Sequence, residues 1–244
     1  MVSPSSRLAA LPRMLLQALL PSSCALCGAV QDRAVCGACS LAYAANHRPR
    51  CPCCANPVGA IDTKRRCGAC LADPPAFDAT VAACDYAAPL DGLVLGLKFG
   101  ARLALAPWMA ARLNEAALRT GAALPDVLCP VPLGPRRLVE RLVVAALEVA
   151  RPLAKALGIP LAPRLLERVL ETAAQSGVAP GERRRNVRGA FALADGQAQL
   201  AGRHVGVVDD VMTSGHTLDE LAGVLKRAGA ARVTNFVFAR TPPN

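Results

Sequence analysis

The pattern of hydrophobic and polar positions divides the chain near Asp73-Pro74-Pro75, a turn-forming break. Beyond this break, short apolar runs predict strands at 80–86, 126–133, 205–208 and 232–239. Between them, apolar residues at helical spacing predict helices at 90–99, 103–119, 138–157 and 217–228. Apolar runs such as Val205–Val208 suit the buried strands of a parallel sheet. The segment 76–244 is therefore predicted to be an α/β domain built on a parallel sheet.

The first 23 residues show a different pattern. Leucines recur at helical spacing between residues 8 and 19 and predict an amphipathic helix that packs on the rest of the protein. The apolar stretch 14–20 resembles a short signal sequence, but Arg13 and Gln17 interrupt it and no small-residue cleavage site follows. A transmembrane helix needs about 20 apolar residues. We therefore expect no transmembrane segment, and association with a membrane surface is the less favoured alternative.

Cysteine spacing dominates residues 24–75. Eight of the 11 cysteines form four Cys-x2-Cys knuckles. A knuckle directs two thiolates at one ion, and two knuckles complete a tetrahedral site without an open position. The sequence therefore predicts a double zinc ribbon with two structural zinc ions. The predicted ligands are Cys24, Cys27, Cys36, Cys39, Cys51, Cys54, Cys67 and Cys70.

The pairing of the knuckles is expected to be sequential, the first two at one ion and the last two at the other, because each set closes a short loop. Spacing alone leaves crossed pairing open. The alternatives to zinc are an iron–sulfur cluster and a disulfide framework, and the latter needs an oxidising compartment. Cys53, Cys84 and Cys129 remain outside the two sets.

Charge and aromatic content narrow the range of possible ligands only slightly. The formal charge is +10, and binding two zinc ions through eight thiolates lowers it by four, to +6. A basic surface suits a polyphosphate ligand as well as it suits DNA. Aromatic residues make up 3% of the chain and are too scattered to form a stacking platform for single-stranded nucleic acid.

The strand at 205–208 leads into the stretch with the most specific chemistry. Asp209 and Asp210 follow it directly, and a loop of small residues then precedes a predicted helix. Unpaired N–H groups at a helix N-terminus bind phosphate, and Gly215 lets the backbone approach it closely. The two carboxylates would not favour a bare anion, so we expect them to face sugar hydroxyls or magnesium. A phosphorylated ribose meets both demands, whereas the alternative is an ordinary β–α turn. The predicted phosphate-binding residues are Thr213, Ser214, Gly215, His216 and Thr217.

Two other segments are predicted to reach the same crevice. A proline-rich loop follows the strand at 126–133, at the edge of the sheet where ligands bind. The polar, cationic segment 171–189 is predicted to be a mobile surface loop, either a solvated linker or a lid that closes over a pyrophosphate. Lys98 is expected to be a solvated helix end. The pyrophosphate and lid candidates are Pro130, Val131, Pro132, Arg136, Arg137, Arg168, Gln175, Arg183 and Arg185.

The order of these motifs along nearly the whole chain resembles the ComF family, which joins a double zinc ribbon to a type I phosphoribosyltransferase-like domain. The resemblance rests on the zinc knuckles, Leu97-Lys98-Phe99, Pro130–Leu133, Arg168-x3-Thr172-x2-Gln175, Arg185-Asn186-Val187 and Val208–Thr217. It implies that the ligand is phosphoribosyl pyrophosphate (PRPP) with magnesium. It also implies a cytoplasmic protein that assists natural transformation, with single-stranded DNA and the DNA-uptake machinery as partners. The domains predicted from the sequence pattern are an N-terminal helix at 1–23, the ribbon at 24–75 and the transferase-like domain at 76–244.

The chain departs from the family pattern at two places. An Arg-Gly-Phe-Asn-Gln run usually follows Pro-Val-Pro-Leu, whereas this chain has Arg141-Leu-Val-Val-Ala145. Purine-type transferases often place an Asp where this chain has Thr213. The ribose-phosphate motif is intact but the groups for transfer are depleted, so no residue is assigned a catalytic role. We expect an accessory PRPP-binding protein, with an active phosphoribosyltransferase as the alternative, and leave the acceptor and oligomeric state open.

Overall fold

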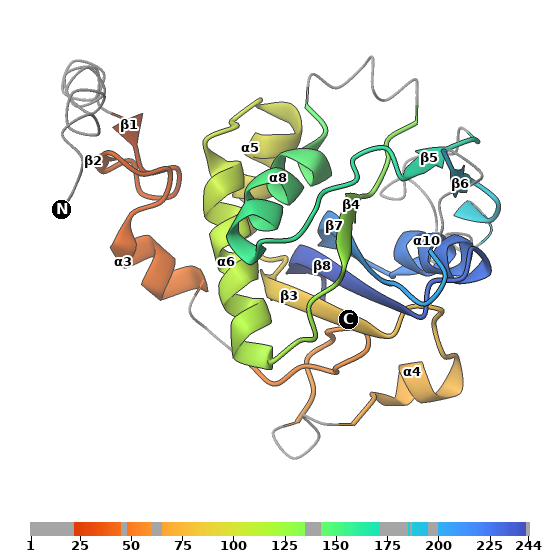
Figure 1. Cartoon of the computed structure of the whole chain (residues 1–244). Helices are drawn as coiled ribbons and strands as arrows, with labels where there is room; N and C mark the ends of the chain where they lie inside the picture. The colour runs from red at the N-terminus through yellow and green to blue at the C-terminus, as the bar shows by residue number, and fades with distance from the viewer. Residues whose placement is uncertain are drawn as a thin grey trace, which may run out of the picture.

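A four-stranded parallel sheet forms the centre of the protein (Figure 1), seen in a computed structural model. The structure describes residues 22–44, 48–59, 65–134, 143–170, 185, 187–194 and 200–242. The strand order is β3-β8-β7-β4. These strands are β3 (Ala79–Asp85), β4 (Val127–Pro130), β7 (His204–Met212) and β8 (Arg232–Arg240). All four strand predictions are confirmed in place, and the parallel α/β fold is confirmed with them.

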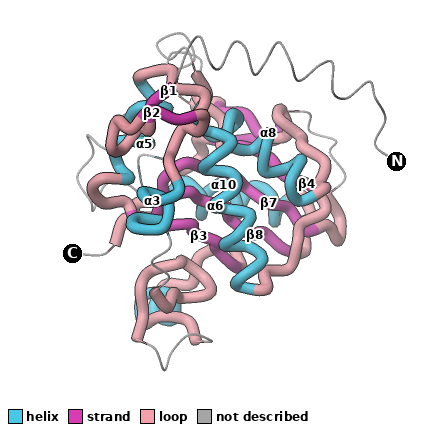
Figure 2. Tube along the Cα trace, turned by 90° about the vertical axis from the view of Figure 1, so that its left-hand side faces the viewer, coloured by secondary structure: helices cyan, strands magenta, loops and turns pink. Residues whose placement is uncertain are grey.

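Helices cover both faces of the sheet (Figures 1 and 2). One face carries α5 (Leu90–Phe99), α6 (Leu105–Thr120) and α8 (Ala145–Leu157). The other carries α10 (His216–Arg227) and the antiparallel hairpin of β5 (Leu166–Arg168) and β6 (Phe191–Leu193).

The strand period of two sorts the apolar side chains between these layers. On β8, Phe236 and Phe238 pack toward α6 and α8, whereas Val233 and Val237 pack toward α10. Both sets are fully buried, as a parallel sheet covered on two sides requires. The sheet therefore holds its loops on a rigid base.

The helix predictions hold for α5, α6 and α10, and for the C-terminal part of the helix predicted at 138–157. In α5, the predicted apolar face of Leu90, Leu93, Val94 and Leu97 is buried. The described part of α8 begins at Ala145, and 135–142 lie outside the described residues. The helix predicted within 1–23 lies outside them except for Ser22 and Ser23, which form β1. No helix in the described part of the chain has the length and hydropathy of a bilayer span.

The cysteine-rich segment consists of short elements around two cysteine sets. The first set has β1 (Ser22–Ser23), β2 (Val30–Gln31), α3 (Gly37–Cys39) and the π-helix η1 (Ser40–Ala44) around it, and α4 (Gly68–Ala72) belongs to the second. Cys24 and Cys39 share the core of the α6 face, whereas Cys51 and Cys54 share the core of the α10 face. The boundary at residue 75 stays a prediction, because both sets pack into the cores of the sheet.

Candidate functional site

A cavity of ≈ 290 Å³ opens at the carboxyl end of β7, where the chain turns into α10. Side chains from β7, its following loop, α5, β5 and the start of α8 surround it. In a parallel sheet this edge is the usual ligand-binding edge. The residues that line it are Tyr86, Lys98, Val131, Pro132, Leu133, Val144, Ala145, Ala146, Arg168 and the continuous run 209–218.

The acidic pair lies within the C-terminal part of β7 and not in the loop. The strand continues to Met212, four residues beyond the end that the sequence predicted for it. Asp210 is 5% exposed, and its Oδ1 lies 3.0 Å from Nζ of Lys98. Oδ1 of Asp209 accepts a hydrogen bond of 2.9 Å from the backbone N–H of Asp210. Burial, and then the charge of Asp210, raise the pKa of Asp209 well above its ordinary value, and Lys98 opposes this rise. A divalent cation or sugar hydroxyls at the pair would offset this repulsion.

Lys98 therefore corrects one sequence-based expectation. We expected a solvated helix end, but the C-terminal end of α5 brings this lysine to the end of β7, where it lines the cavity and pairs with Asp210. Sequence pattern placed Lys98 correctly on its helix. It could not show which strand end the helix terminus reaches, because that depends on tertiary packing.

The loop after Met212 has the geometry of an anion site. Gly215 precedes α10 with φ +85°, a left-handed conformation that glycine adopts most easily. The first helical bond runs from the N–H of Asp219 to the carbonyl of Gly215, so the N–H groups of 216–218 precede the helical ladder. These donors and the positive end of the helix dipole suit a phosphate. A Cβ on Gly215 would lie 2.6 Å from Cε of Met212, so the position is also closely packed.

The part of the cavity lining at the start of α8 is apolar. Val144, Ala145 and Ala146 line the cavity there, and their side chains offer no hydrogen-bond donors. Arg168 also lines it, with its guanidinium 5.3 Å from the centroid of the Phe191 ring and its Nε donating to the carbonyl of Leu170 at 3.3 Å. The sequence departure at 141–145 thus lies, in its described part, at the cavity itself.

The remaining lid candidates divide between described and undescribed residues. Val131 and Pro132 line the cavity together with Arg168, and Pro130 ends β4 next to them. Arg185 is exposed and is not among the lining residues. Four candidates lie outside the described residues: Arg136, Arg137, Gln175 and Arg183.

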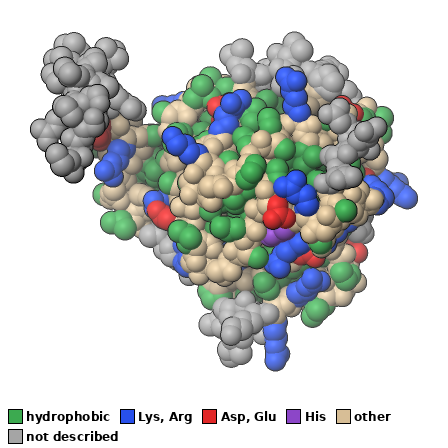
Figure 3. Space-filling view, viewed as in Figure 1, with side chains coloured by type: hydrophobic (Ala, Val, Ile, Leu, Met, Phe, Trp, Pro, Cys, Tyr) green, Lys and Arg blue, Asp and Glu red, His purple; other side chains and the backbone are tan. Residues whose placement is uncertain are grey.

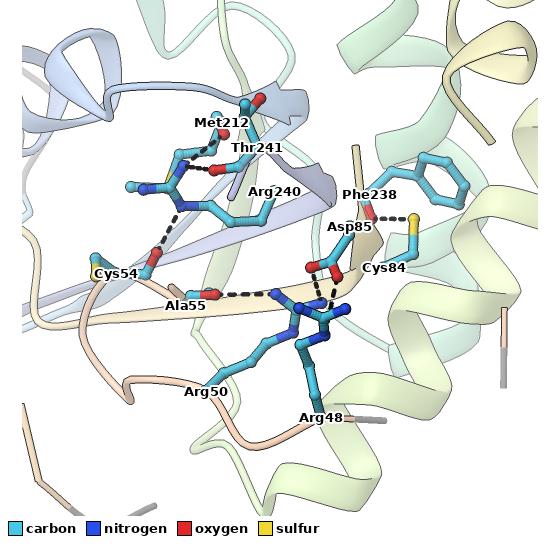
Figure 4. A network of polar contacts seen from close by, with 10 residues as sticks. All are labelled: Arg48, Arg50, Cys54, Ala55, Cys84, Asp85, Met212, Phe238, Arg240 and Thr241. Carbon is cyan, nitrogen blue, oxygen red and sulfur yellow. Dashed lines mark hydrogen bonds and ion pairs between the residues drawn. The ribbon is translucent and has the colours of Figure 1, made fainter. Parts of the chain in front are cut away.

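Sequence reasoning also missed Tyr86 and Arg240. Tyr86 follows β3 and lines the cavity. Arg240 ends β8 and is 5% exposed. It donates to the carbonyl of Met212 (Figure 4) and also to that of Thr213, at the start of the phosphate loop. For Arg240, the only available sequence signal was a charged residue at the end of an otherwise apolar strand.

The eight knuckle cysteines form two sets of four, in which all sulfur atoms lie within 4.8 Å of one another. The sets follow the expected sequential pairing. Sulfur atoms of Cys27 and Cys36 are 3.8 Å apart, and those of Cys54 and Cys67 are 3.5 Å apart. Zinc–sulfur bonds of 2.3 Å at tetrahedral angles place sulfurs about 3.8 Å apart. Both sets therefore fit a closed structural zinc site.

Backbone donors complete both zinc sites. The N–H of Cys36 lies 3.4 Å from the sulfur of Cys24, and the N–H of Cys67 lies 3.2 Å from that of Cys51. Such bonds favour the thiolate form. Cys53, Cys84 and Cys129 lie outside the two sets. All three are buried, and burial raises the pKa of Cys53 to about 11 and those of Cys84 and Cys129 to about 12.

Comparison with known proteins gives the same two-part organisation. Residues 15–71 match the double zinc ribbon domain, and residues 143–242 match the phosphoribosyl transferase domain. Among solved structures, a purine phosphoribosyltransferase from Pyrococcus horikoshii has 23% identity and a TM-score of 0.33, covering 52% of this chain and 70% of its own. The glutamine PRPP amidotransferase from B. subtilis has 22% identity and a TM-score of 0.34, covering 54% of this chain and 26% of its own.

Curated relatives match over most of their length. DNA utilization protein YhgH of Escherichia coli O157:H7 is 35% identical over 229 residues, which are 91% of this chain and 98% of that protein. Competence protein F of Haemophilus influenzae is 31% identical over 180 residues, which are 72% of this chain and 79% of that protein. With a zinc ribbon ahead of a phosphoribosyltransferase domain and this identity over nearly the whole length of its relatives, the chain belongs to the ComF family of competence and DNA utilization proteins.

Proposed function

We propose that the cavity at the end of β7 binds PRPP with magnesium, and that the protein acts as an accessory factor in natural transformation. One observation carries this proposal. An acidic pair and a phosphate loop line the cavity together with Val144, Ala145 and Ala146, which have no side-chain donors. In its described part, the lining thus offers groups that hold a ribose phosphate but few that assist its transfer.

The residues of the cavity fit a magnesium-bound ribose phosphate. Asp209 and Asp210 would hold the ribose hydroxyls and the ion, whose positive charge would offset the repulsion that raises the pKa of Asp209. The N–H groups at the start of α10, with the hydroxyls of Thr213, Ser214 and Thr217, would hold the 5′-phosphate. Magnesium would neutralise charge on the pyrophosphate.

Transfer of the phosphoribosyl group requires more than this binding. The departing pyrophosphate gains negative charge, and losing one preorganised donor typically costs about 100-fold in rate. Arg168 and Lys98 are the basic side chains among the described lining residues, and Lys98 is paired with Asp210. Thr213 cannot act as a carboxylate base. This composition supports binding over the alternative, an active phosphoribosyltransferase.

A link to DNA is supported by the names of two relatives, DNA utilization protein YhgH and competence protein F, and by a second cavity. This cavity of ≈ 540 Å³ lies against the edge strand β3 and is lined by Arg48, Arg50, Arg119 and Arg232. Arg48 and Arg50 share Asp85 at 3.1 and 2.7 Å. Because Arg48 and Arg50 are held in this ion pair, we assign the contacts with the phosphates of single-stranded DNA to Arg119 and Arg232. On the face shown in Figure 3, Lys and Arg are scattered rather than gathered in one patch.

The location and the partners follow from the same chemistry. We infer a cytoplasmic protein, because thiols that bind zinc need a compartment that keeps them reduced. The partners proposed are single-stranded DNA and the DNA-uptake machinery.

Isothermal titration of PRPP with magnesium tests the proposed site. Wild-type protein should bind, and Asp210→Asn should bind at least tenfold more weakly because a charged ligand of the ion is lost. Glu148→Gln, a change on the surface of α8 at a carboxylate outside the cavity lining, is the matched control and should bind like wild type. Equal affinity for wild type and Asp210→Asn would refute the assignment of the acidic pair.

A further inference from the structure

Arg240 joins the second zinc site to the phosphate loop. Its guanidinium is buried, and its Nε donates to the carbonyl of Cys54 at 2.9 Å. Its Nη1 donates to the carbonyls of Met212 and Thr241 at 3.0 and 2.6 Å, and also to that of Thr213. Figure 4 shows this side chain reaching between the two segments. One residue therefore contacts a zinc ligand and the first residues of the phosphate loop.

The charge of Arg240 needs a partner. In the described part of the chain, its hydrogen-bond acceptors are all backbone carbonyls. A buried cation is costly unless an opposite charge compensates it. Four thiolates around one zinc ion carry a net charge of about −2, and Cys54 and Cys70 line one small cavity together with Arg240. The occupied second zinc site would thus supply the counter-charge for Arg240.

A shared cavity and a hydrogen bond also place the second zinc site next to the phosphate loop. A cavity of ≈ 200 Å³ has Cys54 and Cys70 on one side and Ser214, Gly215 and His216 on another. The backbone N–H of Ala76, just after the ribbon, donates to Oδ1 of Asp219 on α10 at 2.7 Å. The first zinc site lies elsewhere, since Cys24 and Cys39 pack in the core of the α6 face.

We propose that the second zinc site, acting through Arg240, holds the phosphate loop in its binding conformation, so that anion affinity and zinc retention are linked. This inference rests on the proposed ribose-phosphate site. Arg240 is a positioning residue, because it contacts loop carbonyls and not the donors that face the ligand. Linkage is reciprocal, so a ligand that needs the ordered loop must also raise the affinity of the second site for zinc. The first zinc site should be unaffected.

The chain provides a matched control at the other anchor of the same ribbon. Arg50 donates to the carbonyl of Ala55 at 3.0 Å and pairs with Asp85 at 2.7 Å (Figure 4). It attaches the ribbon to the end of β3, and its hydrogen bonds and ion pair among the described residues do not reach the phosphate loop. Arg240→Met and Arg50→Met therefore each remove a guanidinium that contacts the second half of the ribbon, and only Arg240 also contacts the loop.

The experiment measures two quantities on the full-length, zinc-loaded protein. Titration gives the affinity for PRPP with magnesium and for inorganic pyrophosphate. Competition for zinc with a chromogenic chelator at equilibrium, with and without each anion, gives the affinity of the protein for both ions. In wild type, the anion should protect one ion by raising its affinity about 5- to 150-fold, the usual range of coupling between sites. Arg240→Met should still hold two zinc ions, bind about 10- to 100-fold more weakly, and lose this protection.

Each result bears on the proposal. Arg50→Met should match wild type in affinity and protection, and Arg240→Lys, which keeps the charge with fewer donors, should be intermediate. If Arg240→Met does not fold, Arg240→Lys carries the test. Wild-type affinity with wild-type protection in the Arg240 variants would overturn the linkage while leaving the ribose-phosphate site intact. Failure of wild type to bind either anion would refute the site and the linkage together.

Discussion

Replacing Gly215 by alanine tests the phosphate loop without removing any charged group. The residue has φ +85°, and a Cβ would lie 2.6 Å from Cε of Met212. A left-handed conformation costs a non-glycine residue about 1 to 2 kcal/mol. The methionine methyl is the end of a flexible side chain and can move, so the backbone conformation is the larger cost.

This backbone cost lowers the affinity for the phosphate, because the variant loop can leave the left-handed conformation when no ligand is bound. The phosphate must then restore the strained conformation, so the affinity of Gly215→Ala for PRPP should fall by about 5- to 30-fold, the equivalent of 1 to 2 kcal/mol. Adding Met212→Ala should recover little of this loss, because it removes the close contact and leaves the φ angle unchanged.

The assay is isothermal titration with PRPP and magnesium, accompanied by thermal unfolding. Gly158→Ala is the control, since Gly158 has φ +68° at the end of α8 with open space around its position. It should lower Tm through the same backbone strain but leave the affinity unchanged. Gly215→Ala with wild-type affinity would refute the claim that this loop holds the phosphate.

Three further predictions follow from the metal sites, the acidic pair and the second cavity. Elemental analysis should give two zinc ions per chain, and Cys67→Ser should retain about one; iron, or a single ion in wild type, contradicts the ribbon assignment. Without magnesium or ligand, Asp209→Asn should raise Tm at pH 7 but not below pH 3.8. The pKa of Asp209 is higher in the folded protein than in the unfolded chain, so its ionised carboxylate destabilises the fold only at pH values above the unfolded-state pKa. An unchanged or lower Tm at pH 7 would show that the pair is not repulsive. Replacing Arg119 and Arg232 by Gln should weaken binding of a single-stranded oligonucleotide in low salt and reduce the salt dependence, whereas Arg151→Gln on α8 should not; equal effects would mean that only net charge matters.

The sequence predicted the elements of the fold well because their signals are local. The apolar faces of α5 and α10 and the apolar runs of β7 and β8 are each contained in one short segment. Sequential pairing of the knuckles also followed from short loop lengths, and the structure resolves it by proximity. The extent of β7 was underestimated because charged residues usually end a buried strand, whereas here Asp209 and Asp210 continue it into the cavity.

The candidate site was predictable where one segment carries its chemistry and not where tertiary packing assembles it. Asp209–Thr217 is contiguous and was found. Lys98 reaches the acidic pair only because α5 ends beside β7, and Arg240 reaches the phosphate loop only because β8 lies next to β7 in the sheet. A single lysine or arginine has no local pattern that distinguishes a site residue from a solvated one, so spatial information was needed for both.

Phosphorus NMR of PRPP with magnesium distinguishes a binding protein from a transferase, because one spectrum reports binding and a time course reports transfer. Wild-type protein should shift or broaden the PRPP resonances, and adding each common purine or pyrimidine base should produce no free pyrophosphate beyond the protein-free blank. Unchanged PRPP resonances would contradict binding. Base-dependent growth of a pyrophosphate signal, abolished by Asp210→Asn, would instead make this protein an active phosphoribosyltransferase.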